Sequence, residues 1–465
     1  MNKNLLYLFL FLIAACGEEE NPSPTLFFAG EIVTPTHDYV ILHKGDMVID
    51  SAKLDENNRF SFSLDSISEG LHYFEHKPEV QYVYLEKGDS LLLRLNTIDF
   101  DESLIFTGIG EEINNFLLEV FLANEEEKDV IYPYFQLDPD DFSRKIDSLR
   151  SIKTRQLREL HEEFPLSDKA LKMAYASIDY NAYVHKELYP FNHKMRTRED
   201  KFHALPDNFY DYRKNVSYND EDLTYLRPYY DYMVNHIRNL TYIGCHHECE
   251  GKYSYSIRNE LHFNKHKMYL IDSLVQEQGL RDNLFRNVAM DYLIMAHDTE
   301  KNNTAFIDEF HKFSGNNKHM DEIDGLYQNL LNIQPEREVP DLAVTDAEGN
   351  MTSLKELSQK EHVVFYFWSG TQKGHFRNIT RRVSVLSKAH PKYEFVGINI
   401  RTDPKRWQSM METAKLDKSL QYRAENSREF RNKLIINRMN YKALITHKGR
   451  IVNAFASLDK SFKKK

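Results

Sequence analysis

Residues 26–110 alternate between apolar and polar side chains over short stretches. The segment 60–64 reads Phe-Ser-Phe-Ser-Leu, a pattern typical of a strand with one buried face. Comparable stretches follow one another, and turn sequences such as the Lys-Gly-Asp at 44–46 and at 87–89 separate them. Many short strands at regular spacing predict an antiparallel β-sandwich over residues 26–110.

A helical period replaces this alternation at about residue 111. One apolar stripe is built from side chains three to five positions apart: Phe142, Ile146, Leu149, Ile152 and Leu157. Ser167 followed by Asp168 is typical of a helix start, and several prolines interrupt the pattern further along. The pattern therefore predicts an irregular helical domain over residues 111–335.

The pattern changes again at residue 338. Residues 362–368, His-Val-Val-Phe-Tyr-Phe-Trp, form an almost continuous apolar run, as expected for a strand covered on both faces. Residues 394–400 form a second such run, and the segment around His447-Lys448-Gly449 predicts a hairpin. Strands that alternate with helical stretches predict an α/β domain over residues 338–465.

The first 25 residues have the composition of an export signal. The apolar run Leu5–Ile13 is too short to span a bilayer, and small residues precede Cys16. The sequence Ile-Ala-Ala-Cys resembles the bacterial lipobox, which implies that residues 1–16 are a signal peptide ending at a lipidated Cys16. Residues 17–25 then form an acidic tether. The alternative is a plain secretory signal. We expect an anchored envelope protein, in the outer membrane rather than the inner one, facing the periplasm or the cell surface.

Charge is spread unevenly along the chain. The net charge is −11, yet residues 338–465 carry +12 and the remainder carries −23. A basic C-terminal domain on an acidic body is compatible with docking within the chain, with attraction to an anionic surface, or with a solvated lysine-rich surface. Because the chain starts with an export signal, we expect no nucleic-acid partner.

Residues 338–456 resemble a known domain. The Val-Pro-Asp-Leu entry, the Glu348-Gly349 turn, the Phe-Tyr-Phe-Trp strand and the hairpin are similar to the thioredoxin-like domain of envelope thiol oxidoreductases of the TlpA/ResA type. The whole chain resembles a larger group of bacterial lipoproteins in which a β-rich domain and a helical middle precede such a domain.

The resemblance also shows what this chain lacks. The two cysteine positions of an active thioredoxin domain fall on Gln372 and His375, and the cis-proline position falls on Asn440. Neither Gln372 nor His375 can form a disulfide, so the resemblance implies a retained fold without thiol exchange at this site. We expect both residues to begin an exposed surface helix, with no catalytic role. Two alternatives stay open: a general base at His375, or peptide binding in the surrounding groove.

The mature chain has two further cysteines, Cys245 and Cys249, in the segment Cys-His-His-Glu-Cys. In an oxidising compartment they could pair as a disulfide or stay as free thiols. A third alternative is a metal site that uses Cys245, His246, His247 and Cys249, with His262 or His266.

These observations predict a lipid-anchored binding or scaffold protein with a redox-inactive thioredoxin-like domain and no cofactor. Its expected partners are the membrane, through the anchor, and a peptide or protein ligand. The alternatives are a thiol-disulfide oxidoreductase that acts through other cysteines, and metal binding at residues 245–249.

Overall fold

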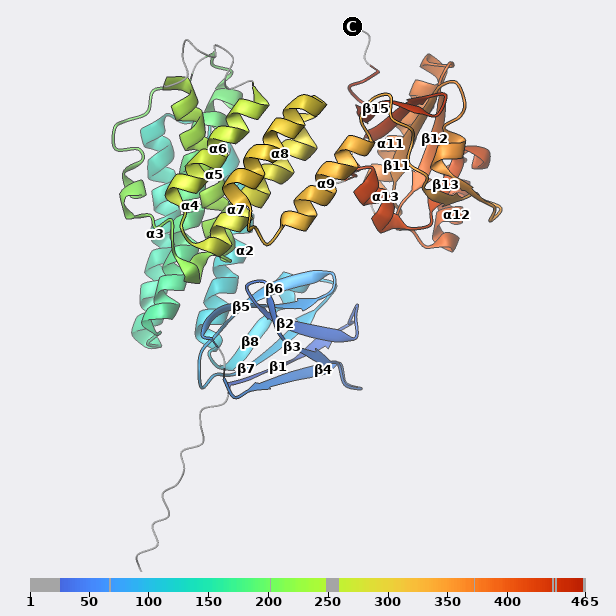
Figure 1. The fold of residues 1–465 in the computed structure, drawn as a ribbon. Coiled ribbons are helices and arrows are strands. Elements are labelled where there is room, and N and C mark those ends of the chain that lie inside the picture. Colours follow the sequence, from blue (N-terminus) through green and yellow to red (C-terminus); the bar gives the residue numbers. More distant parts are fainter. Residues whose placement is uncertain are drawn as a thin grey trace, which may run out of the picture. The chain divides into compact units, whose positions relative to one another are not determined.

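The computed structural model describes residues 26–66, 68–200, 202–247, 259–371, 373–436, 439 and 441–462. Cys16, Cys249, Gln372 and Asn440 therefore lie outside the described residues, and so do the side chains of His246 and His247. The chain divides into two compact units, residues 1–236 and residues 237–465. Each unit is described by itself below (Figure 1).

The first unit begins with two four-stranded sheets. The strand order is β4-β1-β7-β8 in one sheet and β3-β2-β5-β6 in the other. The bounds are β1 Leu26–Val33, β2 Tyr39–Lys44, β3 Met47–Lys53, β4 Arg59–Leu64, β5 Gly70–His76, β6 Glu79–Leu85, β7 Ser90–Asn96 and β8 Ile105–Ile109.

One pair of strands differs from the predicted antiparallel arrangement. β1 runs parallel to β7, with Gly30 opposite Leu93, whereas the other pairs of the two sheets are antiparallel. Between β1 and β7 the chain forms β4 of the first sheet and all four strands of the second sheet, and β7 then returns in the same direction as β1. An alternating pattern fixes which face of a strand is buried but carries no information on the direction of its neighbour.

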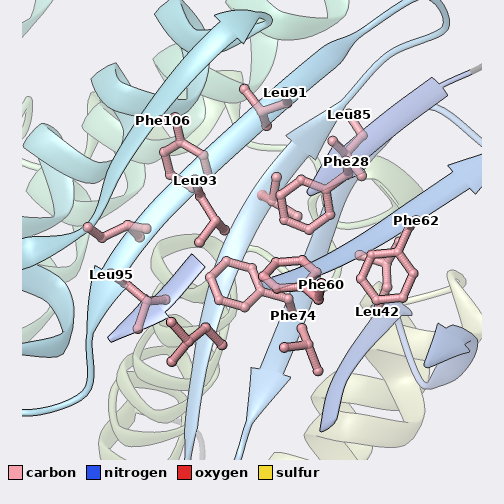
Figure 2. Close-up of a cluster of buried hydrophobic side chains, with 14 of the residues drawn as sticks. Phe28, Leu42, Phe60, Phe62, Phe74, Leu85, Leu91, Leu93, Leu95 and Phe106 are labelled. Carbon is pink, nitrogen blue, oxygen red and sulfur yellow. The ribbon is translucent and has the colours of Figure 1, made fainter. Parts of the chain in front are cut away.

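The inner faces of both sheets share one core (Figure 2). Phe60 and Phe62 of β4 are buried while Ser61 and Ser63 are exposed, so the predicted alternation of this strand is confirmed. The ring of Phe28 lies 5.6 Å from that of Phe60, in an edge-to-face arrangement. The alternating apolar residues therefore hold the two sheets together.

Long helices complete the first unit. They are α1 Phe100–Ser103, α2 Glu111–Tyr134, α3 Pro139–Glu163, α4 Asp168–Thr197 and the first part of α5 Arg227–His247, with short 3₁₀ turns at Asp211–Asn215 and Glu221–Leu223. The Ser167 hydroxyl accepts a hydrogen bond from the Ala170 N–H, which confirms the predicted start of α4. Phe142, Ile146 and Tyr189 pack together in a core between α3 and α4.

The second unit contains further helices and a mixed sheet. The helices of its first part are α6 Glu260–Leu274, α7 Gln278–Asp291, α8 Glu300–Ser314 and α9 Met320–Asn332, with a π-helical turn at Tyr292–Ala296 after α7. Among the described residues, none of the helices is both long enough and apolar enough to cross a membrane.

The sheet of the second unit has the thioredoxin-like arrangement. Its strand order is β10-β9-β13-β12-β11-β14-β15. The bounds are β9 Ala343–Thr345, β10 Met351–Ser353, α10 Leu354–Leu357, β11 Val363–Trp368, α11 Lys373–Ala389, β12 Glu394–Asn399, α12 Pro404–Thr413, β13 Gln421–Ala424, α13 Ser427–Lys433, β14 Lys442–His447 and β15 Arg450–Ser457.

β11 is the central strand of this sheet. It runs parallel to β12 and antiparallel to β14, and all six of its residues are buried. The prediction of a strand covered on both faces is therefore confirmed. The helical segment α11 begins directly after β11, where an active thioredoxin domain places its cysteines.

Candidate functional site

The turn between β11 and α11 is tied to the rest of its domain. The Gly370 N–H donates to the Thr402 hydroxyl at 2.7 Å, and the Gly370 carbonyl accepts from the Arg406 guanidinium at 2.8 Å. A Cβ atom at Gly370 would lie 2.6 Å from Thr402 Cγ2 and 3.0 Å from Met410 Sδ. The turn therefore needs glycine at this position, and it serves the packing of the domain.

His375, which the resemblance aligns with the second cysteine of an active thioredoxin domain, faces the segment before β14. Its Nε2 lies 3.2 Å from the Met439 carbonyl, just before the position that the resemblance aligns with the cis-proline. A carbonyl accepts, so Nε2 carries the proton and Nδ1 holds the lone pair; Nδ1 is buried without a hydrogen-bond partner among the described residues. Burial lowers the pKa of His375, so the ring is neutral near pH 7.

The prediction that His375 is exposed is wrong. The residue is half-buried, and its ring contacts the segment that precedes β14 at the Met439 carbonyl. Among the described residues, we find no acid or nucleophile hydrogen-bonded to His375, and its contact with the Met439 carbonyl ties α11 to the segment before β14. Gln372 and Asn440 lie outside the described residues.

Lys442, which sequence reasoning missed, lies at the start of β14. Burial lowers the pKa of Lys442 to about 7, and its Nζ lies 4.3 Å from the centre of the Phe455 ring. The ring of His297 stacks on Phe455 at 4.2 Å. The aromatic partners are distant in sequence, so no local signal marks this lysine.

Cys245 is buried at the end of α5 and contacts α6. Its Sγ lies 3.0 Å from Nδ1 of His266, and His262 lies one turn before His266 on α6. One ligand atom from each of Cys245, His262 and His266 lies within 4.8 Å of the others. The structure thus brings together Cys245 and the two histidines that the sequence offered as additional ligands. The disulfide with Cys249 stays a prediction because Cys249 lies outside the described residues.

The first unit encloses a cavity of about 710 Å³. Its mostly apolar wall comes from β5, β6, α2, α4 and the start of α5, and includes Val80, Phe121, Ile131, Val184 and Leu188. Val80 and Phe121 keep 53% and 39% of their surface exposed, so apolar side chains reach solvent at the opening. This volume and lining are typical of a small-molecule site.

The charged side chains that line this cavity differ in whether they have a partner of opposite charge. Lys128 forms an ion pair with Glu125, and Arg227 forms one with Asp231. The carboxylates of Glu79 and Asp101 also line the cavity and have no cationic partner among the described residues. Burial, followed by the charges of Glu102, Glu79 and Glu125, raises the pKa of Asp101.

His185 supplies a neutral polar group to the same cavity. Burial, with smaller contributions from the charges of Lys153 and Lys128, lowers the pKa of His185 to about 4. Its Nδ1 is buried without a hydrogen-bond partner among the described residues. Sequence reasoning missed the cavity because its walls come from three separate segments, 71–135, 177–188 and 225–231.

Comparisons with known proteins give matches among solved structures that cover about a quarter of the chain. No family model matches the chain, and no curated protein matches it. Solved structures that it resembles include the thioredoxin domain of a thiol-disulfide oxidoreductase from Bacteroides vulgatus, at 18% identity over 26% of this chain and 86% of that one, with a TM-score of 0.22. Another is a thiol:disulfide interchange protein from a Bacteroides species, at 17% identity over 26% of this chain and 80% of that one, with a TM-score of 0.23. The thioredoxin-like assignment rests on the strand order described above.

Proposed function

We propose that this chain is a lipid-anchored envelope protein that binds a small amphiphilic molecule and does not exchange thiols at its thioredoxin-like domain. The observation that carries the binding role is the apolar cavity of the first unit. The anchor at Cys16 and the envelope location rest on the export signal at the start of the sequence.

The charges at the cavity indicate the class of ligand. Its two cations are already paired, whereas Glu79 and Asp101 are not. A ligand with a positive group would neutralise these carboxylates, while a fatty-acid anion would be repelled. The proposed ligand therefore has an apolar body and a cationic group.

Calorimetric titration of the soluble chain, residues 17–465, tests this proposal. We expect dodecyltrimethylammonium, kept below its micelle-forming concentration, to bind with about one molecule per chain and more tightly than dodecanoate. Asp101→Asn should weaken binding of the cation about tenfold, a loss of ~1.4 kcal/mol, because it removes one carboxylate that accepts from the Gln81 amide but has no cationic partner among the described residues. Tighter binding of dodecanoate would contradict the ligand class.

A cavity-filling variant tests the place of binding. Val184→Trp should abolish binding of dodecyltrimethylammonium, whereas Val385→Trp places the same ring on an exposed position of α11 and should leave it unchanged. Far-UV circular dichroism establishes that both variants are folded. Unchanged affinity in a folded Val184→Trp variant would refute the cavity as the binding site.

The absence of thiol exchange is tested by insulin reduction. We expect no turnover above background, because the two active cysteine positions hold Gln372 and His375. Turnover that disappears in Cys245→Ser or Cys249→Ser would replace this proposal with a thiol-disulfide oxidoreductase that uses the other cysteines.

Metal binding at Cys245 is a second candidate function, favoured by the convergence of Cys245, His262 and His266. A thiolate and two imidazoles suit zinc. Addition of Co²⁺ to the reduced chain should give a thiolate-to-cobalt charge-transfer band that Cys245→Ser removes. A Cys245–Cys249 disulfide would prevent this band in the oxidised chain, and absence of the band in the reduced chain would rule the site out.

A further inference from the structure

A second group of potential metal ligands lies at the end of α4, in the first unit. His193 is on the last turns of the helix, and Glu199 and His203 are in the segment that follows Arg198, whose left-handed backbone (φ 61°) ends α4. Glu199 Oε1 lies 3.5 Å from Nε2 of His193 and 3.4 Å from Nδ1 of His203. One ligand atom from each of the three residues lies within 4.8 Å of the others.

The hydrogen bond on the far side of His193 fixes its tautomer. Nδ1 of His193 lies 3.0 Å from the backbone carbonyl of Phe135, and a carbonyl accepts, so Nδ1 carries the proton. In the neutral ring, Nε2 then holds the lone pair, and Nε2 lies 3.5 Å from Glu199 Oε1. A histidine that ligates a metal ion is commonly oriented by this same bond to a backbone carbonyl.

The side chain of His193 is only 2% exposed, so water does not reach its Nε2. This atom also has no hydrogen-bond partner among the described residues. A lone pair and a carboxylate oxygen thus face each other across 3.5 Å, and a second imidazole approaches the same oxygen. Two acceptors at this separation repel each other unless a positive species, a proton or a metal ion, lies between them. A proton on Nε2 of His193, together with the hydrogen bond between Nδ1 of His203 and Glu199 Oε1, is one arrangement that satisfies these atoms, and a metal ion bound by all three ligand atoms is the other.

The distances agree with a zinc ion. Ligand atoms about 2.0–2.2 Å from a tetrahedral zinc ion lie roughly 3.3–3.5 Å from one another. The two separations from Glu199 Oε1 are 3.4 and 3.5 Å and match this geometry, and the third, between the two histidine nitrogens, is within 4.8 Å. Two imidazoles and one carboxylate favour zinc over magnesium or calcium, which prefer oxygen ligands.

We propose that His193, Glu199 and His203 bind a zinc ion and leave its fourth position open to water or another ligand. The ion would connect the end of α4 to the segment that follows it, and, through the hydrogen bond of His193, to the backbone just beyond α2. The inference is independent of the ligand proposed for the cavity and of the candidate site at Cys245.

Zinc titration of the soluble chain in a Cys245→Ser background, after removal of bound metal with a chelator, tests the site. We expect one zinc ion per chain, and a melting temperature that rises by several degrees on addition of zinc. Glu199→Gln and His203→Ala should each weaken binding at least 100-fold. Both side chains are about one-third exposed, so their loss should leave the chain folded, which circular dichroism establishes.

His311→Ala is the matched control. His311 pairs with Asp324 at 2.7 Å on an exposed surface, and neither belongs to a three-ligand group among the described residues. Zinc affinity should be unchanged in this variant. Co²⁺ bound to the Cys245→Ser chain should give visible d–d bands without a thiolate charge-transfer band, and Glu199→Gln should remove them. The proposal would be overturned if the Cys245→Ser chain failed to bind one zinc ion. It would also be overturned if Glu199→Gln and His203→Ala, made in that background, bound zinc as tightly as the Cys245→Ser chain itself.

Discussion

Glu187 is a buried carboxylate on α4 that is surrounded by donors. It is fully buried and accepts hydrogen bonds from the Tyr212 hydroxyl at 2.8 Å, from Nε of Arg213 at 2.9 Å and from Nδ1 of His236 at 2.8 Å. Burial by itself raises the pKa of Glu187, but the hydrogen bonds and charges of His236 and Arg213 outweigh it and lower the pKa to about 2. The group is therefore ionised at neutral pH, and it links α4 to α5 and to the turn at Asp211–Asn215.

Glu187→Gln removes the charge and keeps the shape. It leaves Arg213, whose side chain is 17% exposed, without its counter-charge, and the new amide group directs hydrogens toward existing donors. Breaking one side of a buried ion pair costs about 3–5 kcal/mol. Arg213 also stacks on the ring of Tyr210, with 3.5 Å between its guanidinium carbon and the ring centre, so its charge keeps one favourable contact in the variant. We therefore expect Glu187→Gln to lower the free energy of unfolding by ~3 kcal/mol, the lower end of that range.

Urea unfolding followed by far-UV circular dichroism measures this loss. Both tryptophans, Trp368 and Trp407, lie in the thioredoxin-like domain, so tryptophan fluorescence reports the second unit and not the perturbed one. Glu159→Gln is the control, since Glu159 and its partner Arg155 are 66% and 62% exposed and the pair should contribute less than ~0.5 kcal/mol. The variant Glu187→Gln/Arg213→Gln should recover part of the stability. A loss below ~1 kcal/mol in Glu187→Gln would refute the reasoning.

Three further predictions concern other parts of the chain. Burial and the charge of Lys44 lower the pKa of His72 to about 4, below the ~6.5 of this side chain in the unfolded chain. Between these two pKa values the folded state binds fewer protons than the unfolded state. The free energy of unfolding therefore falls as the pH drops from 6.5 toward 4. His72→Gln should reduce the difference in unfolding free energy between pH 7 and pH 5 by about 2 kcal/mol, and equal slopes would contradict this. Gly370→Ala should destabilise the thioredoxin-like domain by ~1–3 kcal/mol through its clash with Thr402, measured by tryptophan fluorescence, whereas Gly374→Ala meets no neighbour within 4 Å and serves as the control. Cys16→Ser should move the protein from the membrane to the soluble periplasmic fraction, and membrane retention would rule out the lipid anchor.

The local elements were largely predictable because burial follows the local pattern. Alternation marked β4, and a continuous apolar run marked β11, whose six residues are all buried. The helix start at Ser167 was visible because a hydroxyl before a helical stretch can cap the first N–H groups. These predictions depend on neighbours in the chain, which the sequence displays directly.

Contacts between distant segments could not be predicted in the same way. The parallel pairing of β1 with β7 depends on the path of the chain through the second sheet. His375 became half-buried because a segment more than sixty residues later covers it. His193, Glu199 and His203 lie on both sides of a helix end at Arg198, so their spacing matches no regular period and no compact motif points to them.

The 30-residue helix α4 connects the three features of the first unit that carry chemistry. His185 lines the cavity, Glu187 lies in the buried network, and His193 belongs to the proposed zinc site. At 100° per residue, Glu187 lies about 200° around the helix from His185, and His193 lies about 80° from it, so the three side chains leave the helix in different directions. The rotation of α4 that satisfies Glu187 therefore also sets the directions of the other two. If the network fixes this rotation, Glu187→Gln should weaken zinc binding as well as stability, although Glu187 is not one of the proposed ligands. A folded Glu187→Gln chain that binds zinc as tightly as the unaltered chain would show that the two sites are energetically independent.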